Sequence, residues 1–165
     1  MAYDIEPLGP QHDRGAFCCG NDHLDAFCKE SLDEHLTFRK RIHVACEDDS
    51  EVVIGYYCLS LYSIRAGKAK SVGDPAIHLH YLAVDLQHQG RGIGRLLMRH
   101  ALSSVYDVAQ LAGATWLTLD AVDKRTAGYY RALGFEWLDE DRLKMFIPIE
   151  TIVKLVEQVR TAAKG

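Results

Sequence analysis

A short glycine-rich stretch near the middle of the chain has the composition of an anion-binding turn. Glycine has no Cβ, so the backbone of such a turn can approach a ligand closely. A helix that begins near Ile93 directs its unpaired N–H groups and the positive end of its dipole at that ligand. The stretch therefore predicts a phosphate or pyrophosphate site, although a glycine turn taken alone can simply end a strand. The predicted binding residues are Gln89, Gly90, Arg91, Gly92, Ile93, Gly94 and Arg95.

Two better-known nucleotide motifs do not fit this stretch. The phosphate loop of nucleotide hydrolases requires G-x-x-x-x-G-K-[ST], and the sequence contains no Gly-Lys-Ser or Gly-Lys-Thr. A dinucleotide-binding fold requires G-x-G-x-x-G, and the glycines here alternate with other residues instead. Neither class of nucleotide-binding protein is expected.

Two sequence blocks resemble motifs of the GNAT superfamily of N-acetyltransferases. The first joins Leu82-Ala83-Val84-Asp85 to the glycine-rich turn and looks like the acetyl-CoA motif of that family. The second, residues 129–135, is similar to its F-Y-x-x-x-G-F motif, with Tyr129 in place of phenylalanine. The resemblance implies acetyl-CoA as co-substrate. It also implies that backbone N–H groups of Leu82, Ala83 and Val84 hold the pantetheine arm, and that one of them polarises the thioester carbonyl.

Tyr130 stands where the resemblance places the proton donor to the departing sulfur. A phenol with a pKa of about 10 can protonate a thiolate whose conjugate acid has a pKa of about 8.5. Acetyl transfer is then expected to be direct, without an acyl-enzyme; the alternative is that the Tyr130 hydroxyl only binds the coenzyme. Its neighbour Tyr129 is expected in the core. No general base is assigned, although His78, His80 and Asp120 lie near the relevant strands.

Further short matches resemble one branch of the family, the toxins of toxin–antitoxin pairs that acetylate aminoacyl-tRNA. Cys19-Gly20 followed by Leu24-Asp25-Ala26-Phe27 looks like the C-G-x-x-x-L-D-x-F pattern of this branch, and Ile54-Gly55-Tyr56-Tyr57 supplies its G-Y-Y strand. The resemblance implies transfer to the α-amine of aminoacyl-tRNA and a small ribbon-helix-helix antitoxin as partner. Two alternatives remain open: a GNAT enzyme for a small-molecule amine or a protein N-terminus, and a catalytically inactive CoA-binding module.

Length and composition predict an ordinary globular protein. The 165 residues suffice for a single domain, expected to span residues 1–165, and 48% apolar with 25% charged residues exclude disorder. No apolar run reaches the about 18 residues of a membrane span, and the start lacks a secretory signal, which predicts a cytoplasmic protein without membrane contact. The five cysteines and eight histidines lack metal-ligand spacing, so no metal is expected. The net charge of −4 argues mildly against binding nucleic acid through bulk charge.

The elements expected to position these residues form a GNAT fold of the α/β (α+β) class. A strand, a crossover helix and a further strand imply parallel pairing of residues 79–85 with residues 114–121. The resemblance implies that these two parallel strands splay apart within a mixed central sheet of about six to seven strands, flanked by helices. Strands are expected at residues 3–8, 42–46, 52–64, 79–85, 114–121, 135–138 and 143–149.

Helical periodicity accounts for most of the remaining chain. Helices are expected after a cap at Asn21 or Asp22, over residues 31–36, from Ile93 to Gly113, over residues 126–133 and over residues 149–163. Residues 65–75 are expected to form a polar loop. The periodicity of the last helix leaves open whether it covers the core or forms a homodimer interface.

Overall fold

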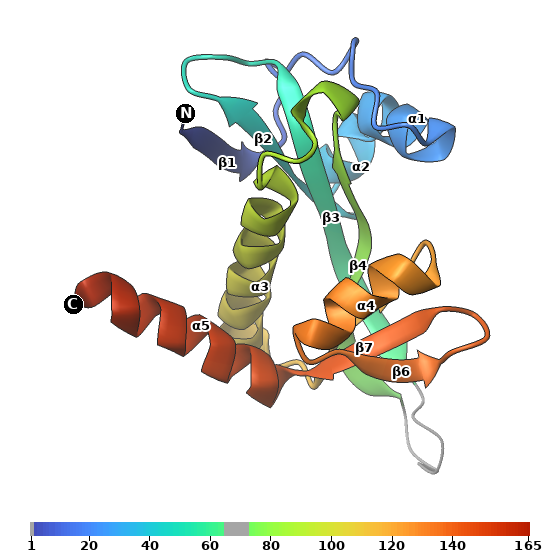
Figure 1. Ribbon diagram of the computed structural model, residues 1–165, viewed down its shortest axis with the longest axis vertical. Helices are drawn as coiled ribbons and strands as arrows, with labels where there is room; N and C mark the ends of the chain where they lie inside the picture. Colours follow the sequence, from blue (N-terminus) through green and yellow to red (C-terminus); the bar gives the residue numbers. More distant parts are fainter. Residues whose placement is uncertain (1, 65–72) are drawn as a thin grey trace. The chain divides into compact units, whose positions relative to one another are not determined.

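The computed structural model describes residues 2–64 and 73–165 (Figure 1). Its strands follow the order β1-β2-β3-β4-β5-β7-β6 in one sheet of seven strands. β4 and β5 pair in parallel, whereas β1 with β2, β2 with β3, β5 with β7 and β6 with β7 pair antiparallel. The expected fold class, a mixed sheet with helices, is confirmed.

The chain divides into two compact units. Unit 1 comprises Met1–Ser60 and His80–Ala101, and unit 2 comprises Leu61–Leu79 and Leu102–Gly165. Three long elements, β3, β4 and α3, contribute to both. Elements of unit 1 are β1 (Tyr3–Pro7), α1 (Asp22–Glu30), α2 (Leu32–Leu36), β2 (Arg41–Glu47), most of β3 (Val53–Ile64), the end of β4 (Asp74–Val84), the 3-10 turn η1 (Leu86–His88) and the start of α3 (Ile93–Ala112).

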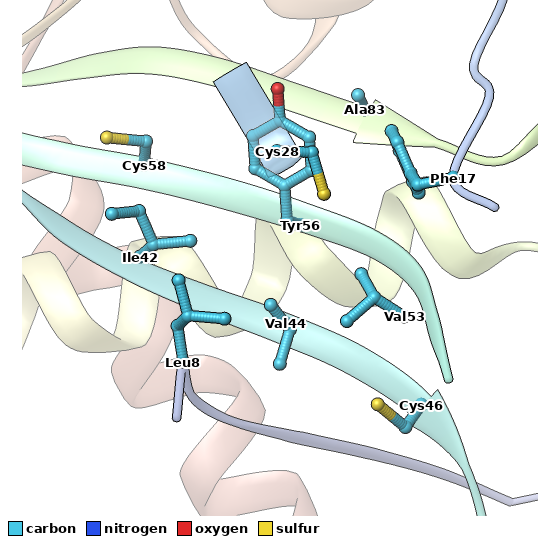
Figure 2. Close-up of a cluster of buried hydrophobic side chains, with 10 residues drawn as sticks. All are labelled: Leu8, Phe17, Cys28, Ile42, Val44, Cys46, Val53, Tyr56, Cys58 and Ala83. Carbon is cyan, nitrogen blue, oxygen red and sulfur yellow. The ribbon is translucent and has the colours of Figure 1, made fainter. Parts of the chain in front are cut away.

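The apolar core of unit 1 lies on one face of β2 and β3. Side chains alternate between the two faces of a strand, so Ile42 and Val44 on β2 share a face, as do Tyr56 and Cys58 on β3. Figure 2 shows these four residues together with Leu8, Phe17, Cys28, Cys46, Val53 and Ala83. Tyr56 is fully buried, and its hydroxyl donates to the Leu24 carbonyl at 2.8 Å. This hydrogen bond ties α1 to the sheet.

Gly55 permits a close approach in unit 1, and we expect Gly55→Ala to destabilise the protein. A Cβ at this position would lie 2.9 Å from Leu97 Cδ1 and 3.2 Å from the Ala83 carbonyl oxygen. Leu97 is fully buried and cannot move aside freely. Overpacking of this kind lowers the free energy of unfolding by about 1–3 kcal/mol, which urea unfolding would measure.

Gly128→Ala is the matched control for Gly55→Ala. Gly128 lies in a helix, and a Cβ there meets no atom within 4 Å. Alanine should raise the free energy of unfolding by about 0.5–1 kcal/mol at such a helical position. Equal stability of Gly55→Ala and the wild type would contradict the close packing around Gly55.

Unit 2 contains the rest of the sheet. Its ladder between β4 and β5 is parallel and joins Ala76–Leu79 to Trp116–Leu119. The predicted parallel pairing of these two strands is confirmed. The strand expected at residues 79–85 begins earlier, at Asp74, and it is this early part of β4 that pairs with β5. The further elements are β5 (Trp116–Asp120), α4 (Lys124–Ala132), β6 (Glu136–Asp139), β7 (Lys144–Pro148) and α5 (Ile149–Lys164).

The prediction of a polar loop over residues 65–75 was wrong at its end. Asp74 and Pro75 belong to β4, and proline is tolerated at the beginning of a strand. The prediction for residues 65–72 lies outside the described residues. Across the ranges 2–64 and 73–165, no helix is long and apolar enough to cross a membrane.

Candidate functional site

The glycine-rich turn connects the end of β4 to the start of α3 within unit 1. Gly90 and Gly92 have φ values of 77° and 84°, a region that residues with a Cβ rarely adopt. The Leu96 N–H donates to the Gly92 carbonyl at 3.1 Å, which closes the first turn of α3. The amides of Ile93, Gly94 and Arg95 therefore have no acceptor inside the helix and are available to an anion. The turn has the predicted geometry.

A cavity of about 300 Å³ lies at this turn. Gly90 and Gly92 leave space at its wall, because a Cβ on either would meet no atom within 4 Å. Ala83, by contrast, packs into the core of unit 1 with 6% of its surface exposed, so only its backbone is a candidate for ligand contact. The lining residues are Leu82, Val84, His88, Gln89, Gly90, Gly92, Ile93 and Gly94.

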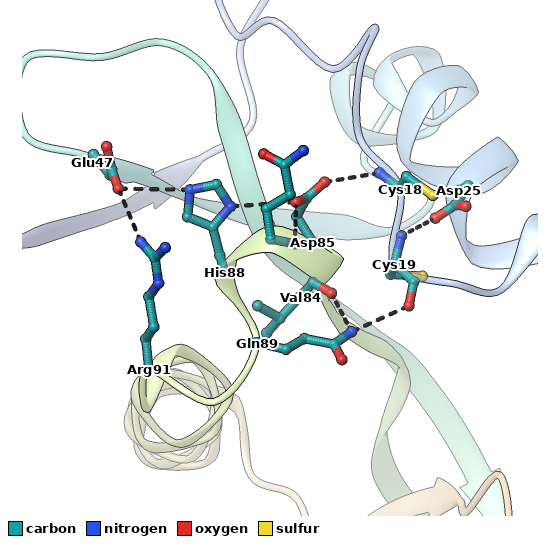
Figure 3. A network of polar contacts seen from close by, with 10 residues as sticks. Cys18, Cys19, Asp25, Glu47, Val84, Asp85, His88, Gln89 and Arg91 are labelled. Atoms are coloured by element: carbon teal, nitrogen blue, oxygen red, sulfur yellow. Dashed lines mark hydrogen bonds and ion pairs between the residues drawn. The ribbon is translucent and has the colours of Figure 1, made fainter.

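Gln89 holds the turn in place through its side chain. Its Nε2 donates to the Val84 carbonyl at 2.9 Å and to the Cys19 carbonyl at 3.2 Å (Figure 3). The first bond spans five residues, whereas the second connects the turn to the segment before α1. Gln89 also lines the cavity, but these contacts give it a structural role that its sequence position alone did not reveal.

A polar network surrounds Asp85, the residue that follows the end of β4. The two Asp85 carboxylate oxygens accept hydrogen bonds from the backbone N–H groups of Cys18 and Gln87, both at 3.0 Å (Figure 3). His88 contacts Asp85 at 3.3 Å and Glu47 at 3.6 Å. His88 is a cavity residue that the sequence prediction missed; its spacing of three from Asp85 is the only local signal.

The two arginines of the turn are not cavity-lining side chains. Arg91 Nη1 lies 4.0 Å from Glu47 Oε1, and both side chains are substantially exposed. Such a pair contributes little to stability in water. Arg95 is exposed in the first turn of α3. Both remain predicted binding residues at the rim.

We expect Asp85→Asn to destabilise unit 1 and to change its response to acid. Burial alone would raise the pKa of Asp85, but hydrogen bonds from Cys18, Gln87 and His88 outweigh burial and lower it. A lowered pKa means that the carboxylate stabilises the fold above the ordinary pKa of about 3.9, and that this contribution is lost as the pH falls through the folded-state value.

The asparagine variant turns an N–H group toward a backbone donor. Leaving that donor without an acceptor should lower the free energy of unfolding by about 1–3 kcal/mol at pH 7. Urea unfolding at pH 6 and pH 3 would measure both effects, and Asp85→Asn should lose less stability on acidification than the wild type. An equal acid-induced loss would contradict the assignment of this pKa shift.

Tyr130 lies in unit 2, on α4. The side chain of Asp123 caps this helix by accepting from the Thr126 N–H at 2.7 Å, and Gly134, with a φ of 108°, follows its end. Tyr130 is half-buried, with its ring centroid 5.6 Å from that of Phe135. Burial raises the pKa of Tyr130 to about 12. The phenol therefore keeps its proton at physiological pH.

The expectation that Tyr129 is a core residue was wrong. Its side chain is 38% exposed. Tyr130 lies three residues after the buried Ala127 and therefore on the same face of α4. Tyr129 is only two residues after Ala127, so its side chain points away from that buried face.

The titratable side chains within residues 2–64 and 73–165 do not assemble a metal centre. In the described part of the chain, no group of three or more His, Cys, Asp or Glu residues could hold a metal ion. His78 Nδ1 lies 2.6 Å from Thr118 Oγ1, and burial is the main cause that lowers the pKa of this histidine. All five cysteines have free thiols.

Comparisons with known proteins identify the family. A family model described as "Acetyltransferase (GNAT) domain" matches residues 39–137. The "Probable toxin TacT" of Sinorhizobium fredii is 31% identical over 92% of this chain and 94% of its own. The chain therefore belongs to the GNAT acetyltransferases.

Two solved structures add ligands and partners to this family likeness. A tyrosine-to-phenylalanine mutant of the toxin AtaT, bound to the C-terminus of the antitoxin AtaR and acetyl-CoA, has a TM-score of 0.81 and 26% identity, covering 94% of this chain and 98% of that one. AtaT complexed with acetyl-methionyl-tRNAfMet has a TM-score of 0.80 and 27% identity, covering 93% and 99%. Both likenesses extend over nearly the whole chain.

Proposed function

We propose that this protein transfers an acetyl group from acetyl-CoA to the α-amine of aminoacyl-tRNA, as the toxin of a toxin–antitoxin pair. The observation that carries the proposal is the glycine-lined cavity at the N-terminus of α3, in a chain of the GNAT family. Acetyl-CoA is bound to AtaT in a related structure, and its pyrophosphate matches the chemistry of the turn. Charged tRNA is found in the cytoplasm, which is the proposed location.

The proposed coenzyme contacts are mainly backbone groups. The amides of Gly92, Ile93 and Gly94 bind the pyrophosphate, with Gln89 and Gly90 shaping the turn. Arg91 and Arg95 add positive charge at the rim. The residues of β4 from Leu82 through Ala83 to Val84 lie beyond the ladder with β5, so their backbone groups are assigned to the pantetheine arm and the thioester carbonyl.

The proposed chemistry is direct attack of the amine on the thioester carbonyl. A backbone N–H group of Leu82–Val84 stabilises the oxyanion, and the Tyr130 phenol protonates the departing thiolate. The raised pKa of Tyr130 keeps this proton in place until sulfur carries negative charge. These steps need no metal ion, because the N–H dipole polarises the carbonyl and the phenol supplies the proton.

The acceptor and the partner are proposed from the relatives. AtaT is complexed with acetyl-methionyl-tRNAfMet in one structure and with the antitoxin AtaR in another. An antitoxin of the ribbon-helix-helix class and a homodimer through α5 are further parts of the proposal. The family match at residues 39–137 includes parts of both units, which supports one N-acetyltransferase domain over residues 1–165.

Acceptor competition tests this function. The protein would be incubated with acetyl-CoA labelled in its acetyl group and with one acceptor at a time. The acceptors are charged tRNA, deacylated tRNA, free amino acids and a peptide with a free N-terminal amine. Label on charged tRNA alone is expected. Label on small amines or peptides, with none on charged tRNA, would favour the alternative acceptors, and acetyl-CoA binding without any transfer would favour an inactive module.

A further inference from the structure

We propose that Ser60 and His80 form a proton relay that deprotonates the acceptor amine. Ser60 Oγ lies 2.6 Å from His80 Nε2, within unit 1. This inference rests on the proposed function, because it requires an amine acceptor. It assigns the general base that the sequence left unassigned.

The position of His80 along β4 supports this role. Leu82 and Val84 line the cavity at the end of the strand nearest the glycine turn, and His80 lies farther from the turn on the same strand. A coenzyme whose phosphates bind at the turn extends its arm along β4 toward His80. Because a strand rises about 3.3 Å per residue, His80 is about 13 Å along the strand from Val84. The thioester end of the coenzyme therefore lies on the His80 side of the cavity.

A hydroxyl between amine and imidazole gives a balanced proton path. Ser60 can donate its O–H to His80 Nε2 while its oxygen accepts from the ammonium group. One ammonium proton moves to Ser60 as the Ser60 proton moves to His80, which leaves a neutral amine. The amine then forms the C–N bond, and the C–S electron pair leaves with sulfur, which takes the Tyr130 proton. The acetylated nitrogen then loses a second proton to the Tyr130 phenolate, which restores the phenol. His80 releases its proton to water.

Several other histidines of unit 1 already have partners suited to structural roles. His35 Nδ1 accepts from the Ile42 N–H at 3.0 Å. His12 Nε2 lies 2.8 Å from Glu6 Oε1. The Tyr57 hydroxyl lies 2.8 Å from His100 Nδ1. None of these contacts involves β4, along which the coenzyme arm is proposed to run.

The surroundings of the relay include three further titratable side chains, Tyr81, Cys58 and Lys40. The Tyr81 ring centroid is 6.1 Å from that of His80. Burial raises the pKa of Cys58, two residues before Ser60, to about 12. The hydrogen bond that Lys40 donates to the Glu34 carboxylate is the main cause that raises the pKa of Lys40, with Cys58 and Tyr81 adding to it. An imidazole is the side chain most often used as a general base in catalysis.

The test is the pH dependence of kcat/KM for His80→Gln and for Ser60→Ala. Each variant should lose about 100-fold at pH 6.5, within the range for removal of a general base. The loss should shrink toward pH 8.5, because an α-amine deprotonates unaided above a pKa of about 7.7–8.0. Ser60→Thr keeps the hydroxyl and should keep the wild-type profile. Acetyl-CoA affinity, measured by calorimetry, should be unchanged in all three variants.

His23→Gln is the matched control, because His23 Nε2 also contacts a hydroxyl, that of Tyr81 at 3.0 Å, but lies on α1. It should behave as the wild type. A pH-independent loss in His80→Gln, wild-type rates in Ser60→Ala, or equal losses in Ser60→Ala and Ser60→Thr would each overturn the relay. Should His80→Gln not fold, the two Ser60 variants decide. A wild type that acetylates only small amines would contradict the tRNA proposal, and the same pH series on those amines would still test the relay.

Discussion

Tyr130→Phe should lower kcat for acetyl transfer by about 100-fold or more while leaving acetyl-CoA affinity near that of the wild type. The variant removes only the hydroxyl, so the ring can still pack against Phe135 at the observed centroid separation of 5.6 Å. Because the pKa of Tyr130 is raised to about 12, the wild-type enzyme should show no loss of activity from tyrosine ionisation up to pH 9. Steady-state kinetics and calorimetry with acetyl-CoA measure the two effects separately.

Tyr129→Phe is the control on the same helix. Tyr129 is 38% exposed, and loss of its hydroxyl should leave kcat unchanged. Wild-type turnover in Tyr130→Phe would remove Tyr130 as the proton donor. Equal losses in both variants would indicate a disturbance of α4 instead.

Gly94→Asp should weaken acetyl-CoA binding by about 100-fold without lowering the melting temperature. The new carboxylate would lie in the first turn of α3, where the pyrophosphate is proposed to bind. Two unit charges at 4 Å repel by about 4 kcal/mol at an effective dielectric constant of 20, and screening reduces this to about 2–3 kcal/mol. In the unliganded protein the same carboxylate interacts favourably with the helix dipole, by about 0.3–1 kcal/mol.

Gly94→Ala separates charge from size at this position. Its Cβ would lie 3.8 Å from Val84 Cγ2, an ordinary contact, so affinity for acetyl-CoA should stay near the wild-type value. Calorimetry with acetyl-CoA and thermal unfolding of both variants provide the measurements. Wild-type affinity in Gly94→Asp would place the phosphates elsewhere, whereas equal losses in both variants would indicate steric exclusion.

The glycine turn could be predicted because its geometry is local. Positive φ values at Gly90 and Gly92 and a helix start at Ile93 follow from residue types within a few positions of one another. The cap of α1, predicted at Asn21 or Asp22, is local in the same way: the Asn21 side chain accepts from the N–H groups of His23 and Leu24.

Contacts between distant segments could not be predicted in the same way. Gln89 bonds to the Cys19 carbonyl 70 residues away, and Asp85 accepts from Cys18 across 67 residues. No periodicity encodes such pairs. The beginning of β4 was also mispredicted: its polar start at Asp74 carries little strand signal, although it precedes the segment that pairs with β5.

The relay proposed for Ser60 and His80 illustrates the same limit. Neither residue belongs to one of the sequence motifs described above, and 20 residues separate them. Only the pairing of β3 with β4 brings the hydroxyl and the imidazole together, so the sequence alone could name His80 as one of several candidates but could not select it.

The most direct test of the central claim is the location of the transferred acetyl group on charged tRNA. After single-turnover reaction with acetyl-CoA, nuclease digestion would release the 3′-terminal aminoacyl-adenosine for mass spectrometry. One acetyl group on the α-nitrogen of the amino acid is expected, with none on deacylated tRNA. An acetyl group on a base or ribose, or no acetylation while acetyl-CoA binds normally, would contradict the account.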